Sequence, residues 1–105
     1  MIGTLRDAVA DDEPRMLQFY QKVITECGHT VVAKASNGRQ LVEVCHDYKP
    51  DLVITDIKMP DMDGLEAAAE VRDSRPTPFI VVSAHYDPQF VETALENHVL
   101  AYLVK

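Results

Sequence analysis

Short apolar runs alternate along the chain with stretches in which apolar residues recur at helical spacing. Such alternation is typical of βαβ units, in which consecutive strands lie parallel and a helix connects them. The sequence therefore predicts an α/β domain with a doubly wound parallel sheet. Strands are expected near residues 5–10, 30–34, 51–55, 79–83 and 100–104.

The first two helices have recognisable start and stop residues. Asp12 is expected to cap the first helix, with Pro14 in its opening turn, and Gly28 is expected to end it. The second helix should follow Asn37-Gly38 and stop before Pro50, because proline cannot continue a helix.

The third and fourth helices are expected to follow Asp63-Gly64 and to begin at Asp87-Pro88. Asn97 is expected to end the fourth helix in the left-handed conformation. No repeat or interdomain linker interrupts this order, so residues 1–105 are expected to form one domain.

Three carboxylates are expected at one edge of the sheet. Asp11 and Asp12 follow the first apolar strand, and Asp56 follows the third. Ligands of parallel sheets gather beyond the carboxyl ends of the strands, so these side chains should share one crevice. Like charges repel unless a cation compensates, and oxygen-only ligands favour Mg²⁺. Because carboxylates are nucleophiles towards phosphoryl groups, the cluster predicts phosphoryl chemistry with Asp56 as the acceptor.

Two polar residues complement this cluster from the other half of the chain. Ser83 ends the fourth apolar run beside the small Ala84, and Lys105 ends the fifth. A hydroxyl and an ammonium at the same sheet edge could both reach the oxygens of a phosphoryl group.

These residues, in this order, resemble a response regulator receiver domain of two-component signal transduction, of the chemotaxis-regulator type. The resemblance covers essentially the whole chain and includes the loop Met59–Gly64 and Tyr102. It implies a five-stranded sheet of flavodoxin-like order 2-1-3-4-5. It also implies that a sensor histidine kinase or a small acyl phosphate phosphorylates Asp56, and that the domain catalyses only its own phosphorylation and dephosphorylation.

The resemblance assigns roles to the surrounding residues. Asp12 and Asp56 would bind Mg²⁺ directly, Asp11 directly or through water, and the backbone carbonyl of Lys58 would complete the protein ligands. Lys105 would pair with the acyl phosphate. Ser83 would move to a phosphoryl oxygen and Tyr102 would turn inward, which makes the two residues a switch for an output domain or partner protein.

One further resemblance concerns the output domain that the receiver would control. Residues 83–88 and 101–105 resemble receivers attached to RNA-binding antiterminator domains of the ANTAR type, although a DNA-binding output or a stand-alone receiver stays open.

The family continues beyond the lysine equivalent to Lys105 with a fifth helix, so the chain is expected to be cut before that helix. Since this helix often contributes to homodimers, oligomeric state is left open.

Charge and composition exclude several other classes. The net charge of −7 argues against direct nucleic-acid binding, which needs a basic face. Cys27 and Cys45 lack zinc spacing and are expected to be reduced, buried thiols. No apolar stretch is long enough to span a membrane and no signal peptide is evident, so a cytoplasmic protein is expected.

Some interpretations compete with these predictions. A degenerate receiver that serves only as an interaction module is the main alternative, and a phosphatase would need an acidic residue where Lys58 stands. Asp7 falls inside the first strand and is read as its polar entrance, because an unpaired buried carboxylate would be costly. The histidines lack metal-ligand spacing and are expected on the surface or in loops: His29, His46, His85 and His98.

Overall fold

A computed structural model describes residues 3–84, 87–97 and 99–105 of the chain. Five parallel strands form one sheet in the order β2-β1-β3-β4-β5, which confirms the predicted topology. The elements in chain order are β1 (Arg6–Ala10), α1 (Pro14–Glu26), β2 (Thr30–Ala35), α2 (Gly38–Tyr48), β3 (Leu52–Thr55), α3 (Gly64–Ser74), β4 (Phe79–Ser83), α4 (Pro88–Glu96) and β5 (Ala101–Val104).

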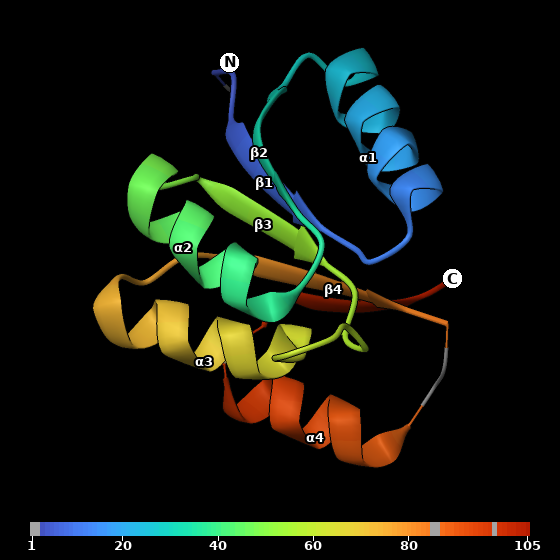
Figure 1. The fold of residues 1–105 in the computed structure, drawn as a ribbon, viewed down its shortest axis with the longest axis vertical. Helices are drawn as coiled ribbons and strands as arrows, with labels where there is room; N and C mark the ends of the chain where they lie inside the picture. Colours follow the sequence, from blue (N-terminus) through green and yellow to red (C-terminus); the bar gives the residue numbers. More distant parts are fainter. Residues whose placement is uncertain (1–2, 85–86, 98) are drawn as a thin grey trace.

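Helices cover the two faces of the sheet unequally. Helix α1 lies on one face, and α2, α3 and α4 lie on the other (Figure 1). On the α1 face, Tyr20 and Ile24 pack against Val9 of β1. Toward β5 this face has no helical cover in the described part of the chain, and the side chain of Leu103 is 52% exposed there.

At two helix ends the structure corrects the prediction, in the position of the cap for α1 and in the backbone conformation for α4. The N-cap of α1 is Glu13 and not Asp12, because a proline forces the residue before it into an extended conformation and delays the helix until Pro14. Asn97 does end α4, but with φ −97° it is not left-handed. Its side-chain amide instead donates to the carbonyl of Thr93 at 2.9 Å.

The predictions for the cysteines and histidines are confirmed in part. Cys45 is buried, and burial raises the pKa of its thiol to about 12. Cys27 is exposed at the C-cap of α1, so its predicted burial is wrong. His46 is exposed, and His29 is half-buried and accepts a hydrogen bond from the Leu5 amide. The predictions for His85 and His98 lie outside the described residues.

Asp7 contradicts the interpretation as a polar strand entrance. The residue is 2% exposed in β1, beside an irregularity in the pairing with β2. Its Oδ1 has no hydrogen-bond partner among the residues that the structure describes. Burial raises the pKa of this carboxyl, the charge of His29 lowers it and that of Asp51 raises it further.

Within the described ranges, no helix combines the length and the apolar character that crossing a membrane requires.

Candidate functional site

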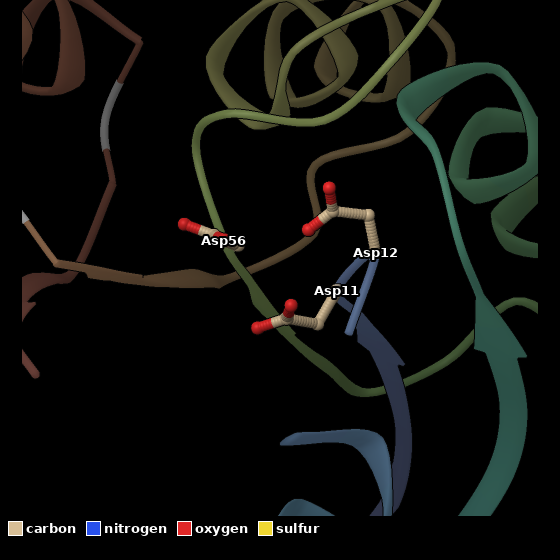
Figure 2. A group of neighbouring side chains, drawn as sticks. All are labelled: Asp11, Asp12 and Asp56. Carbon is tan, nitrogen blue, oxygen red and sulfur yellow. The ribbon is translucent and has the colours of Figure 1, made fainter. Parts of the chain in front are cut away.

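Three acidic residues meet beyond the carboxyl ends of the two central strands. Asp11 and Asp12 follow β1, and Asp56 follows β3, which pairs with β1 up to Ala10 and Thr55. One carboxylate oxygen from each residue lies within 4.8 Å of the other two. Figure 2 shows the three side chains at the adjoining strand ends, pointing to the same side. The parallel register therefore produces the predicted cluster.

The three carboxylates differ in their surroundings. Asp11 is fully buried, Asp56 is 8% exposed and Asp12 is exposed. Asp11 accepts a hydrogen bond from the Glu13 amide at Oδ1 (2.9 Å), and Asp56 accepts one from the Ile57 amide at Oδ1 (2.7 Å). Asp12 makes no hydrogen bond or ion pair with any residue in the described ranges, so its oxygens are available to a ligand.

Lys105 joins the two buried carboxylates. Its Nζ lies 3.1 Å from Asp11 Oδ2 and 3.2 Å from Asp56 Oδ2. Its own amide donates to the carbonyl of Ser83 at 2.7 Å, which holds the end of β5 against β4. A residue from the edge strand thereby reaches the centre of the sheet.

The charges in the cluster do not cancel. Burial raises the pKa of Asp56, although the neighbouring ammonium of Lys105 lowers it in part. Burial lowers the pKa of Lys105, but its hydrogen bonds and charge pairing with Asp11 and Asp56 outweigh burial and leave that pKa raised. One ammonium faces three carboxylates, so a bound cation would relieve the remaining repulsion.

The loop after Asp56 is held close to the strand that precedes it. The Thr55 hydroxyl donates to the Asp56 carbonyl at 2.8 Å, and the Gly64 amide donates to the Ile57 carbonyl at 2.8 Å. A Cβ at Gly64 would collide with the carbonyl oxygen of Asp56. Only a residue without a side chain allows this close approach.

The remaining predicted residues lie around the cluster. Ser83 is buried at the end of β4, and Lys58 has an exposed side chain two residues after Asp56. Tyr102 is half-buried and packs against the cluster that contains Ile57 and Val81. The structure thus brings Asp11, Asp12, Asp56 and Lys105 into direct proximity, with the other three on neighbouring segments.

One contact was not predicted from the sequence. The Tyr20 hydroxyl, from α1, lies 3.4 Å from Asp11 Oδ2. Tyr20 belongs to the apolar stripe of its helix, so its position reads as ordinary packing. The one indication of this contact in the sequence is the hydroxyl itself, because a buried tyrosine usually finds a hydrogen-bond partner.

The donor set of the cluster suits a hard divalent cation. All three candidate ligands are carboxylate oxygens, which Mg²⁺ prefers over nitrogen or sulfur. Ligands on opposite sides of a Mg²⁺ ion lie roughly 4.2 Å apart, so oxygens spread over 4.8 Å need only small side-chain rotations to bind it.

Comparison with known proteins places the chain in a family. The sequence profile of the response regulator receiver domain matches residues 8–105. The chain belongs to the response regulator receiver domain family. Such domains serve two-component signalling, and the predicted family is confirmed.

The chain is similar to one part of each of two longer proteins. It is 38% identical over 100 residues to the transcriptional regulatory protein PdtaR of Mycobacterium tuberculosis, covering 95% of this chain and 49% of PdtaR. It is 46% identical over 79 residues to a protein-glutamate methylesterase/protein-glutamine glutaminase of Natronomonas pharaonis, covering 75% of this chain and 22% of that protein. The receiver therefore spans about half or less of the length of these relatives.

Solved structures of receivers share the fold. The response regulator domain of Thermotoga maritima CheB superposes with a TM-score of 0.90 at 28% identity, covering 98% of this chain and 79% of that one. A DNA-binding response regulator of the LuxR family from Staphylococcus aureus superposes with a TM-score of 0.89 at 31% identity, covering 95% of this chain and 85% of that one.

Proposed function

We propose that this receiver accepts a phosphoryl group on Asp56 in a Mg²⁺-dependent reaction. The observation that carries the proposal is the convergence of Asp56, two further carboxylates and the Lys105 ammonium at one strand edge. Three carboxylates beside a single ammonium contribute nothing to apolar packing. The repulsion among the carboxylates opposes folding. Binding of a cation and of phosphoryl oxygens accounts for the arrangement.

In the proposed site, Asp11, Asp12, Asp56 and the backbone carbonyl of Lys58 would hold Mg²⁺. When bound, the ion neutralises negative charge between the carboxylates and the phosphoryl oxygens. The exposed Asp12 is the open ligand, whereas the buried Asp11 already accepts hydrogen bonds at both oxygens. These contacts favour a direct bond from Asp12.

The proposed reaction is a nucleophilic displacement. A carboxylate oxygen of Asp56 attacks phosphorus, and the bond from phosphorus to the donor nitrogen or oxygen breaks. The leaving phosphohistidine nitrogen or acyl oxygen keeps the electron pair. Lys105, whose Nζ lies 3.2 Å from Asp56 Oδ2, would pair with the oxygens of the acyl phosphate.

The readout would use the neighbouring strand ends. Ser83 would hydrogen-bond a phosphoryl oxygen, and Tyr102 would turn inward to change a surface near α4. The partners proposed are a sensor histidine kinase and an output domain or effector, in the cytoplasm, with a homodimer as an option. The similarity to PdtaR supports control of gene expression, and an ANTAR-type RNA-binding output is one form of it.

Mass spectrometry of the intact protein tests the proposal. After incubation with acetyl phosphate and Mg²⁺, the native receiver should gain one phosphoryl mass, and a chelator or Asp56→Asn should abolish the gain. Asp61→Asn is the matched control, because Asp61 is exposed on the same loop and its φ of 68° suits asparagine equally. No gain in the native receiver would favour the alternative of a non-phosphorylated interaction module.

A further inference from the structure

Tyr20 reaches the acidic cluster from the helix that packs beneath it. The residue is 6% exposed, and its ring packs in the apolar cluster with Val9 and Ile24 on the α1 face of the sheet. Its hydroxyl lies 3.4 Å from Asp11 Oδ2. A phenylalanine would fill the same space with its ring, so packing alone gives no reason for the hydroxyl.

The hydroxyl shares its acceptor with Lys105. Asp11 Oδ1 accepts from the Glu13 amide at 2.9 Å, and Oδ2 accepts from both Lys105 Nζ at 3.1 Å and Tyr20 at 3.4 Å. The Tyr20 contact is longer than an ordinary O–H···O hydrogen bond, as expected for a donor that competes with an ammonium for one oxygen. It is the weaker of the two while Lys105 stays on Asp11.

The balance changes if Lys105 turns to a phosphoryl group. The ammonium would then leave a fully buried carboxylate oxygen, and an unsatisfied buried acceptor is costly. Tyr20 is the other side chain that donates to Asp11 among the described residues. Its hydroxyl can satisfy Oδ2 and hold the carboxylate in its orientation.

We infer that Tyr20 is a positioning residue for Asp11. It keeps this carboxylate oriented towards Mg²⁺, directly or through water, when Lys105 pairs with the phosphoryl group, and so sets the Mg²⁺ affinity of the phosphoryl-bound state. The inference rests on the proposed function. Outer hydrogen-bond partners of this kind commonly govern metal affinity in proteins.

Titration of Mg²⁺ into Tyr20→Phe tests the inference, with and without beryllofluoride as a stable phosphoryl analogue. With the analogue, the Mg²⁺ Kd should rise about tenfold, the lower end of the usual cost of losing an outer partner. Without it, the Kd should change less, because Lys105 still holds Asp11. Tyr48→Phe is the matched control, since Tyr48 is 48% exposed on α2 and should leave both values unchanged.

Two further measurements separate positioning from a general loss of structure. In an Asp11→Asn background, Tyr20→Phe should add no change in Mg²⁺ affinity, since its effect passes through Asp11. The ¹³C chemical shift of the Asp11 carboxyl should move in Tyr20→Phe with the analogue bound, at a temperature where circular dichroism shows both proteins folded.

The possible failures are distinguishable. A native receiver that binds no Mg²⁺ overturns the proposed function, and this inference with it. Native binding together with a Tyr20→Phe Kd that is unchanged, or weakened equally with and without the analogue, overturns the inference alone.

Discussion

At the scale of single residues, Asp7 is the clearest conflict between sequence and environment. It is buried in β1 with Oδ1 unpaired among the described residues, and burial raises its pKa above the ordinary value of 3.8. The folded state therefore binds the proton more tightly than the unfolded state does. Ionising this carboxyl destabilises the fold, and that penalty is absent below pH 3.8 and complete above the raised pKa.

Asp7→Asn is accordingly expected to stabilise the receiver at pH 7 by roughly 1 kcal/mol. The amide keeps the shape of the side chain and cannot ionise. The gain in stability should shrink as the pH falls towards 3.8, because the Asp7 carboxyl of the unsubstituted protein is then increasingly protonated in both the folded and the unfolded state. Urea unfolding at pH 7 and pH 4.5 measures it, with the exposed Asp73→Asn as control. Equal gains at both pH values would show that ionisation is not the cause.

At the scale of elements, the start of α2 abuts the loop that follows Asp56. The Gly38 amide donates to the Met62 carbonyl at 2.9 Å, and a Cβ at Gly38 would collide with that oxygen. Gly38 is thus required because the start of α2 lies so close to the Met62 backbone, and not because of an unusual backbone angle. The first residue of α2 therefore holds in place the loop that carries the Lys58 carbonyl.

Gly38→Ala is expected to lower the free energy of unfolding by about 1–3 kcal/mol, because the loop or the helix must move apart. Gly3→Ala is the control, since nothing lies within 4 Å of a Cβ there. Thermal unfolding measures the stability, and amide NMR spectra should show the largest shifts in residues 57–64. An effect no larger than that of Gly3→Ala would contradict a tight contact.

Element boundaries also show what the sequence could predict. Strand ends were predictable, because each apolar run stops at a charged residue, and these ends correctly placed Asp11, Asp56 and Lys105 at one edge of the sheet. The cap of α1 was not, because the effect of Pro14 on Glu13 outweighed the capping preference of an aspartate. Gly38 and Tyr20 were missed as site neighbours, since their contacts depend on tertiary packing that no local pattern contains.

At the scale of the whole molecule, Lys105 links the edge strand to the two central strands through Asp11 and Asp56. Lys105→Met removes the ammonium from two buried carboxylates. We expect a loss of about 1–3 kcal/mol in the free energy of unfolding with a chelator present, reduced because Lys105 is partly exposed. Saturating Mg²⁺ should restore much of the loss by supplying positive charge.

Denaturant titrations of native protein and Lys105→Met, each with chelator and with Mg²⁺, measure this dependence. Lys22→Met is the control, since Lys22 is exposed on α1 and pairs with no carboxylate among the described residues. A loss that Mg²⁺ leaves unchanged would mean that Lys105 acts by packing its aliphatic chain.

The Lys105 contacts also bear on when the site forms during protein synthesis. They join residues 94 and 49 positions apart in the chain, so Asp11 and Asp56 leave the ribosome well before their ammonium partner does. Domains that depend on distant contacts complete their structure late. A nascent chain therefore holds Asp11 and Asp56 without the Lys105 ammonium until residue 105 has emerged and β5 has paired with β4.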